Sequence, residues 1–313
     1  MSKSYYSLGL MSGTSMDGVD ASIIQSDGET KYKVIIDKYF EYPQDIFKNL
    51  TKLRDKISSS KDLKKFKKEI KKIEKEITLF HSEAVKEIIK KTKVNIDLVG
   101  FHGQTIYHNV KEKISKQLGD GKLLSDLTKK TVVYNFREND LKNDGEGAPL
   151  APIFHQLIKN KYKMKVPLVI LNIGGITNAT YFNTNEKMNS KDIGPGNCMI
   201  DQWIRNNSNK KYDEKGNLAK LGKINKKILN KSLKKFENIN HLRTYDVKDF
   251  DSSFVDGMSL EDGAATLTEC TLEILNKKIK KISKNLKENI VLSGGGRKNI
   301  FLIKKLQEKI NLP

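Results

Sequence analysis

The stretch of sequence that decides the fold is Leu8-Gly-Leu-Met-Ser-Gly-Thr-Ser-Met-Asp-Gly-Val-Asp-Ala-Ser-Ile-Ile24. Apolar residues open and close it, and small polar residues fill its middle. This pattern predicts two strands joined by a tight turn. Gly13 and Gly18 permit positive φ and allow a ligand to come close to the backbone. We therefore expect a hairpin whose turn binds a ligand.

The turn of this hairpin carries groups that suit a chain of phosphates. Ser12, Thr14 and Ser15 add hydroxyls to the backbone N–H groups, and both can donate to phosphate oxygens. Asp17 and Asp20 have the wrong charge for a bare phosphate, but they fit a Mg²⁺ between carboxylate and phosphates, usually through water. The alternative is a surface hairpin that uses glycine and aspartate only for turn geometry. The stretch contains neither GxxxxGK[ST] nor a GxGxxG that opens a helix.

The composition indicates a soluble chain with room for two domains. Its 313 residues allow two domains of about 150 residues each. The mean hydropathy is −0.56, and no apolar run approaches the roughly 20 residues of a membrane span. The chain starts directly into a strand, so we expect no signal peptide. The two cysteines, Cys198 and Cys270, predict neither a disulfide framework nor a metal motif, which favours a cytoplasmic protein.

The net charge of +20 raises the hypothesis of a nucleic-acid-binding protein. The lysines are spread along the chain, and glutamates are interleaved with them on the expected helix faces. Aromatic residues do not alternate with the lysines as stacking platforms would. We therefore expect a solvated, lysine-rich surface, with no specific nucleic-acid partner and no membrane.

Regular elements can be predicted along the first half from periodicity and turn residues. Tyr5–Met11, Val19–Ser26 and Lys33–Tyr42 are expected to form an antiparallel meander. Apolar residues at steps of three and four predict one long helix over Ser60–Thr92. A short apolar strand is expected at Ile96–Phe101.

The cluster His102-Gly-Gln-Thr105 follows that short strand, where α/β proteins place ligand contacts. His102 and Gln104 can form hydrogen bonds with hydroxyls or phosphate oxygens. The alternative is a structural histidine that is satisfied within the fold. Arg137, after the next expected strand, suits recognition of an anion.

The second half repeats the theme of the first. Pro167–Asn172 and Ala179–Phe182 read as strands, and the glycine-rich segment Asn172-Ile-Gly-Gly-Ile-Thr-Asn178 joins them. We interpret this as a duplication of the fold, with a domain junction near residues 135–165. Two such hairpins facing each other would hold a polyphosphate from both sides.

Two further glycine-rich segments belong to the second half. Asp192 ends a third expected strand before Ile-Gly-Pro-Gly, where a carboxylate could act as a general base. The alternative is that Asp192 caps the turn or the following helix. Ser293-Gly-Gly-Gly-Arg-Lys-Asn299 joins a strand to a helix, and its glycines would let an adenosine lie against the backbone. The alternative there is a flexible loop.

These segments together resemble the anhydro-N-acetylmuramic acid kinase family, within the actin-like and sugar-kinase ATPase superfamily. The matching blocks are GLMSGTSMDGVDA at 9–21, GFHGQTIYH at 100–108, NFREND with GEGAPLAP at 135–152, NIGGITN at 172–178, DIGPGNCMIDQW at 192–203 and SGGGRKN at 293–299.

The resemblance implies an α/β fold of two RNase H-like domains, residues 1–150 and 151–313, with a central nucleotide cleft. It implies an ATP-dependent phosphotransferase with an alcohol acceptor, which opens the ring of 1,6-anhydro-N-acetylmuramic acid with water and phosphorylates its 6-oxygen. The product is N-acetylmuramic acid 6-phosphate, in the recycling of cell-wall peptidoglycan. The alternative is a nucleotide-binding, actin-like module without sugar turnover.

The resemblance also assigns roles to residues. Asp192 falls on the catalytic base, and Asp17 is the candidate for organising Mg²⁺. The candidate sugar contacts are His102, Gln104, Thr105 and Arg137. The candidate ATP-binding residues are Gly13, Thr14, Ser15, Met16, Asp17, Gly18, Val19, Asp20, Asn172, Gly174, Gly175, Gly294, Gly295, Gly296 and Asn299.

The sequence departs from the family pattern in three places, the first of which is Asn135, where the family more commonly has Asp. Where the family usually has a Pro-Lys-Ser-type segment, this chain reads His241-Leu-Arg-Thr-Tyr-Asp246, so Arg243 and Thr244 are expected to substitute. Family members continue for several dozen residues beyond Pro313, so we expect a C-terminal domain that is short for the family. A homodimer is common in the family, although the sequence itself does not give the oligomeric state.

Overall fold

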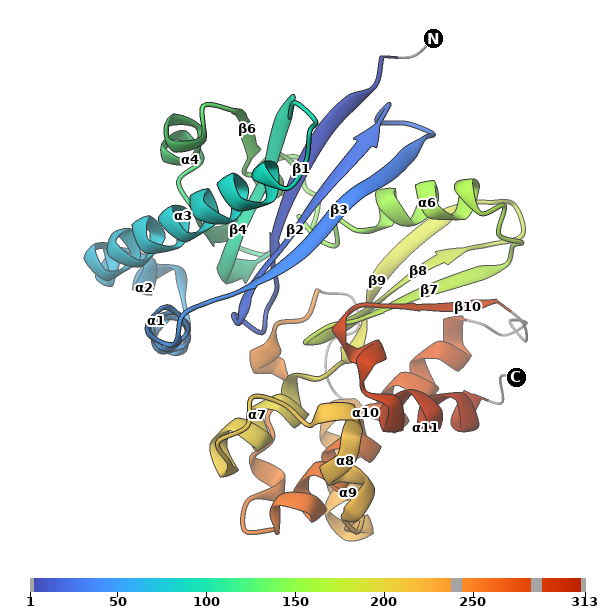
Figure 1. Cartoon of the computed structure of the whole chain (residues 1–313). Helices are drawn as coiled ribbons and strands as arrows, with labels where there is room; N and C mark the ends of the chain where they lie inside the picture. The colour runs from blue at the N-terminus through green and yellow to red at the C-terminus, as the bar shows by residue number, and fades with distance from the viewer. Residues whose placement is uncertain (1–2, 238–243, 283–288, 311–313) are drawn as a thin grey trace. The chain divides into compact units, whose positions relative to one another are not determined.

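The structure is a computed structural model that describes residues 3–237, 244–282 and 289–310. The chain divides into two compact units, Met1–Ala148 and Pro149–Pro313. Each unit has its own sheet (Figure 1). Each also has its own hydrophobic core. We call them the N-terminal unit and the C-terminal unit.

The sheet of the N-terminal unit begins with an antiparallel meander. Its strands are β1 (Tyr5–Ser12), β2 (Gly18–Ser26), β3 (Tyr32–Glu41), β4 (Leu98–Asn109), β5 (Ile114–Leu118) and β6 (Thr131–Tyr134). The order is β3-β2-β1-β4-β5, and β6 also pairs with β4. Both β1 and β6 run parallel to β4. Leu8 and Leu10 of β1 are buried opposite Ile23 and Ala21 of β2, because alternate side chains of a strand share a face.

Helices of the N-terminal unit gather over the buried face of this sheet (Figure 1). They are α1 (Gln44–Lys56), α2 (Ser60–Lys65), α3 (Lys67–Lys90) and α4 (Gly121–Thr128), whereas the short helix α5 (Glu138–Lys142) follows β6 and contributes no residue to this core. α3 packs against β2, β3 and β5 and against α1 and α4. Its buried residues Ile70, Ile73, Ile77, Ala84 and Ile88 form the apolar stripe that the sequence predicts.

Two expected element boundaries in this unit are wrong. The single helix expected over residues 60–92 is two helices, because Phe66 leaves helical geometry with φ −97° and ψ 19°. Ser59 and Asp62 form a capping box at the start of α2. The strand expected to end at Phe101 continues to Asn109, because Gly103 adopts φ +70° and lets β4 carry on beside β5.

The sheet of the C-terminal unit repeats the arrangement. Its strands are β7 (Leu168–Ile173), β8 (Ile176–Phe182), β9 (Met188–Pro195) and β10 (Ile290–Ser293). The order is β10-β7-β8-β9, in which β7, β8 and β9 form an antiparallel meander and β10 runs parallel to β7. In both units, therefore, three strands form an antiparallel meander, and a later strand pairs in parallel with the first strand of that meander. The expected α/β fold with duplicated RNase H-like halves is confirmed.

The sheet of the C-terminal unit is covered on both faces. Its helices are α6 (Pro152–Lys161), α7 (Cys198–Asn207), α8 (Asn217–Leu221), α9 (Lys226–Glu237), α10 (Leu260–Ile282) and α11 (Ile300–Ile310), with short 3₁₀ turns η1 (Glu214–Gly216), η2 (Val247–Asp249), η3 (Ser253–Val255) and η4 (Gly295–Lys298). Leu171 and Ile173 face the larger core with α7 and α10. Ile170 and Phe182 face the opposite side, where His155 of α6 bonds the Thr180 hydroxyl at 2.7 Å.

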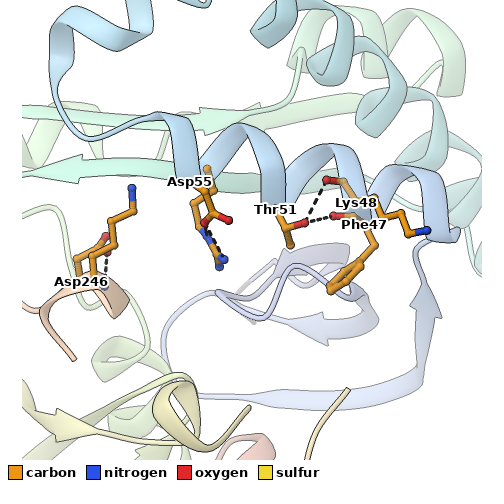
Figure 2. A network of polar contacts seen from close by, with 7 residues as sticks. Phe47, Lys48, Thr51, Asp55 and Asp246 are labelled. Atoms are coloured by element: carbon orange, nitrogen blue, oxygen red, sulfur yellow. Dashed lines mark hydrogen bonds and ion pairs between the residues drawn. The ribbon is translucent and has the colours of Figure 1, made fainter. Parts of the chain in front are cut away.

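Polar surface side chains are satisfied locally. On α1, Thr51 Oγ1 donates to the carbonyl oxygens of Phe47 and Lys48 at 3.0 and 3.1 Å (Figure 2). In the C-terminal unit, the Asp246 carboxylate accepts from the backbone N–H of Lys248 at 2.9 Å and so caps η2 (Figure 2). Over the described part of the chain, no helix is both long enough and apolar enough to cross a membrane.

Candidate active site

The turn between β1 and β2 carries the first group of candidate residues. Residues Gly13 to Asp17 form it, and Met16 N–H donates to Gly13 O at 3.2 Å. Met16 adopts φ +59° and turns its side chain into the core, with 1% exposed. Gly18 cannot carry a side chain, since a Cβ would lie 2.3 Å from Phe40 O. A ligand at this turn would therefore contact its backbone groups and its small side chains.

A buried chain of hydrogen bonds lies beneath this turn. His81 Nδ1–H donates to Ile77 O at 2.8 Å, so the neutral ring accepts at Nε2. The Ser12 hydroxyl, 3.2 Å from Nε2, donates to it and accepts from the Tyr42 hydroxyl at 2.9 Å. Burial lowers the pKa of His81 to about 4, which keeps the ring neutral. The Ser12 hydroxyl is therefore committed below the turn, contrary to the expectation that it binds phosphate.

Gln104 and Thr105 lie on β4, inside the N-terminal unit. Gln104 is fully buried, and its Nε2 donates to Gly13 O at 2.8 Å, so it fixes the first residue of the turn. Its Oε1 is buried without a hydrogen-bond partner among the described residues. Thr105 Oγ1 accepts from Gln117 Nε2 at 3.1 Å.

His102 and Arg137 form a linked pair. His102 Nδ1–H donates to Gly103 O at 2.7 Å, and Nε2 accepts from Arg137 Nε and Nη2 at 3.1 and 2.9 Å. Burial and the charge of Arg137 lower the pKa of His102 to about 4. Arg137 Nη1 also donates to Gly147 O at 2.7 Å. Both imidazole nitrogens are engaged within the unit, so His102 orients Arg137.

Acidic side chains gather at the end of the β2–β3 hairpin. Asp17 Oδ1 accepts from Ser15 Oγ at 2.6 Å. Burial, and then the nearby charges of Asp17, Glu41 and Asp20, raise the pKa of the Tyr39 hydroxyl. Within the described ranges, no three His, Cys, Asp or Glu side chains are arranged to hold a metal ion directly.

The second glycine turn, Gly174–Gly175 between β7 and β8, holds the start of α7. Gly175 O accepts from Gly196 N at 2.8 Å, and Gly174 O accepts from Asn197 N at the same distance. A Cβ on Gly196 would lie 2.1 Å from Gly174 O. Backbone hydrogen bonds therefore join the two motifs at 172–178 and 192–203.

Asp192 owes its orientation to a β-bulge. Thr177 pairs with Gly194 and Asn178 with Asp192, so Ile193 is skipped in the ladder. Ile193 then packs in the core while Asp192 joins the side of the sheet that carries α6. The expectation that the strand ends at Asp192 is wrong, because β9 continues to Pro195.

A row of polar residues crosses the C-terminal sheet through the four strands. We call it the polar row: Ser293, Asn172, Asn178 and Asp192, each paired with the next in the ladder. Ser293 Oγ donates to Asn172 Oδ1 at 3.4 Å. Asp192 Oδ2 accepts from the backbone N–H of Tyr245 at 2.9 Å. Paired residues share a face, so the row gathers these side chains on one side.

The segment before Tyr245 was expected to contribute Arg243 and Thr244. Arg243 lies outside the described residues. Thr244 is described, and it directly precedes Tyr245, whose backbone N–H donates to the Asp192 carboxylate.

The triple glycine follows β10. Gly294 adopts φ +82°, and a Cβ there would lie 2.5 Å from Ile173 O. A Cβ on Gly296 would lie 2.3 Å from Ile173 Cγ2, but one on Gly295 would meet nothing within 4 Å. Asn299 is buried, and its Oδ1 accepts from Leu302 N at 3.0 Å at the start of α11. Among these three glycines, Gly295 is therefore the one that the fold could replace by a residue with a side chain.

The structure places the candidate residues in two local groups. The first comprises Gly13–Asp20 with Gln104 beneath, and the His102–Arg137 pair, within the N-terminal unit. The second comprises the polar row with the two glycine segments in the C-terminal unit. The sequence gives Asn178 no role of its own, although this residue ends the NIGGITN block at 172–178. Its ladder position beside Asp192 depends on the bulge, which local sequence does not reveal.

Comparison with known proteins gives the family. The model of the family described as "Anhydro-N-acetylmuramic acid kinase" matches residues 5–312. A protein of that name from Pelagibacter ubique (strain HTCC1062) is 54% identical over 99% of this chain and 84% of its own length. One from Zymomonas mobilis subsp. mobilis is 35% identical over 98% of this chain and 85% of its own.

Solved structures show only weak likeness. The activator of the 2-hydroxyisocaproyl-CoA dehydratase from Clostridium difficile aligns with a TM-score of 0.42 and 11% identity, over 100% of this chain and 87% of that one. The ethanolamine utilization protein EutJ from Carboxydothermus hydrogenoformans aligns with a TM-score of 0.42 and 10% identity, over 99% and 83%. The assignment therefore rests on the sequence relatives, and by them the chain belongs to the anhydro-N-acetylmuramic acid kinase family.

Proposed function

We propose that this chain transfers the γ-phosphoryl group of ATP to the 6-oxygen of 1,6-anhydro-N-acetylmuramic acid and opens the anhydro ring with water. The product is N-acetylmuramic acid 6-phosphate. The family match over residues 5–312 carries the proposal. The two glycine turns and the oriented carboxylate of Asp192 supply the local chemistry that the reaction needs.

The turn Gly13–Asp17 is proposed to bind phosphate oxygens through its backbone N–H groups, that of Ser15 among them, and the Thr14 hydroxyl, since the Ser15 hydroxyl donates to Asp17. The side chain of Met16 anchors the turn in the core, and Gln104 holds Gly13 O from below. A turn fixed in this way needs little reorganisation when charge develops on the transferred phosphoryl group.

The donor set near Asp17 fits a hydrated Mg²⁺. Mg²⁺ usually keeps several waters and binds one or two carboxylates together with phosphates. Asp17 is fixed by Ser15, and Asp20 and Glu41 add negative charge nearby. The ion would neutralise phosphate charge during transfer.

Asp192 is proposed to act as the general base. It takes a proton from the water that attacks the anomeric carbon, and the bond from that carbon to the bridging 6-oxygen breaks. The freed oxygen then attacks the γ-phosphorus, whose bond to the bridging oxygen of ADP breaks as ADP leaves. Tyr245 N–H binds one carboxylate oxygen, Oδ2, and so orients the group. Arg137, held by His102 and Gly147 O, is proposed to bind the carboxylate of the sugar's lactyl group.

Gly294→Ala and Gly295→Ala form a matched pair that separates the fold from nucleotide binding. Gly294→Ala should lower the free energy of unfolding by about 1–3 kcal/mol or more, because of its positive φ and the contact with Ile173 O. Gly295→Ala should leave the melting temperature unchanged, since its Cβ would meet nothing within 4 Å. If adenosine lies against Gly295, the added methyl should raise KM for ATP about tenfold. Thermal unfolding and initial rates measure the two effects, and an unchanged KM would argue against adenosine at this glycine.

The direct test is a mass-spectrometric assay with ATP and 1,6-anhydro-N-acetylmuramic acid. We expect a product heavier than the sugar by one water and one phosphoryl group, with one ADP formed per product. In ¹⁸O-labelled water, the label should appear at the anomeric carbon. Binding of ATP without any phosphorylated sugar would contradict the proposal and favour a nucleotide-binding module.

A further inference from the structure

One atom of the Asn178 side chain, its Oδ1, has no hydrogen-bonding role in the described part of the fold. Its Oδ1 is buried and has no hydrogen-bond partner among the described residues. A buried acceptor without a donor is costly, and native structures rarely keep one without a functional reason. A missing donor at this place points to a ligand that supplies one.

Asn178 is paired with Asp192, the proposed general base, across strands β8 and β9. Asn178 stands directly opposite Asp192 in the ladder, and the bulge at Ile193 is what brings the two together. Without that bulge the apolar Ile193 would stand opposite Asn178, and Asp192 would pair with Ala179 on the core side of the sheet. The backbone irregularity therefore creates a pair of oxygen acceptors on one face.

We propose that Asn178 Oδ1 is the second acceptor for the water that attacks the sugar, with Asp192 as the first. This inference rests on the proposed function. A water has two hydrogens, so it can donate to both oxygens and keep its lone pairs free for attack. One hydrogen passes to Asp192 as the new bond to the anomeric carbon forms and the bond to the 6-oxygen breaks. The other stays on the oxygen and becomes the hydrogen of the new anomeric hydroxyl.

Two acceptors also select water over other nucleophiles. Methanol has one hydroxyl hydrogen, so on binding it would donate to Asp192 and leave Asn178 Oδ1 unpaired. Its methyl group would take the place of the second hydrogen. Leaving a buried polar group unpaired discriminates strongly against the wrong ligand. The site should therefore hydrolyse the anhydro ring even in the presence of methanol.

Asn178→Ala should remove that selectivity. With methanol added, we expect the fraction of 1-O-methyl product, heavier than the hydrolysis product by one CH₂ group, to rise at least about tenfold. We expect kcat to fall about 10- to 100-fold, with KM for ATP unchanged. Mass spectrometry of the products and steady-state kinetics measure these effects. Asn178→Asp keeps an oxygen acceptor and should retain the selectivity for water.

Controls separate this role from a structural one. Asn189→Ala makes the same change on an exposed position of β9 and should leave the product ratio as in the wild type. Asn178→Ala should not lower the melting temperature, because the lost acceptor has no partner in the fold. An unchanged product ratio, or a loss of stability without a change in selectivity, would overturn this inference but leave the proposed function intact. A wild-type chain that forms no phosphorylated sugar would overturn the proposed function and this inference with it.

Discussion

Asp192→Asn should lower kcat for sugar phosphorylation by about 10²- to 10⁴-fold, the range that a general base contributes. The carboxamide keeps an oxygen that can accept from Tyr245 N–H, so the local backbone should stay in place. It cannot take a proton from water at neutral pH. The melting temperature and the affinity for ATP should therefore remain close to the wild-type values.

Single-turnover product formation, ATP binding and thermal unfolding together test this prediction. Asp251→Asn is a matched control, because Asp251 is an exposed carboxylate of the same unit that accepts from Ser253 Oγ at 2.6 Å. It should leave turnover unchanged. Full turnover by Asp192→Asn would show that another group takes the proton. Loss of turnover together with unfolding would instead favour the capping role that the sequence left open.

Local sequence signals predicted the elements that depend on local chemistry. The hairpin turn at Gly13–Asp17 and a helix directly after Asn299 follow from the placement of glycines, and the structure has both, the helix as α11. The repeat of strand, glycine turn and strand also exposed the duplication of the fold. These features need no knowledge of what packs against them.

The sequence did not predict features that depend on a neighbouring strand or on a side chain packed from elsewhere in the fold. The apolar stripe runs through Phe66 without interruption, so its period does not show that the helix breaks there. The continuation of β4 needs β5 beside Gly103, and the bulge at Ile193 needs β8. His81 occupies a position of the buried stripe, where a polar ring is unexpected until Ser12 is seen to bond it.

The chain should lose much of its stability between pH 6.5 and pH 4, because of His81 and His102. Burial lowers the pKa of each ring from the ordinary 6.5 to about 4. In this window the unfolded chain binds protons at both rings that the folded chain excludes, so the stability present above pH 6.5 is lost as the pH falls. At pH 5, which is 1.5 units below the ordinary value, each ring should cost about 2 kcal/mol.

Urea unfolding at pH 7.5 and pH 5 measures this loss. His81→Gln and His102→Gln remove one titrating ring each, so each variant should lose about 2 kcal/mol less than the wild type between the two pH values. Carboxylates also contribute to acid unfolding, but they contribute equally to all three proteins, and the difference isolates the rings. An equal loss in the wild type and both variants would show that neither ring excludes a proton.

The same protonation reaches the turn Gly13–Asp17, which we propose binds phosphate, through Ser12. A neutral His81 accepts the Ser12 hydroxyl at Nε2, whereas an imidazolium has no acceptor to offer. Charging this ring would break the chain from Tyr42 through Ser12 and leave a buried hydroxyl facing a donor. We therefore expect KM for ATP to rise below about pH 5 in the wild type and less steeply in His81→Gln, even where both proteins remain folded.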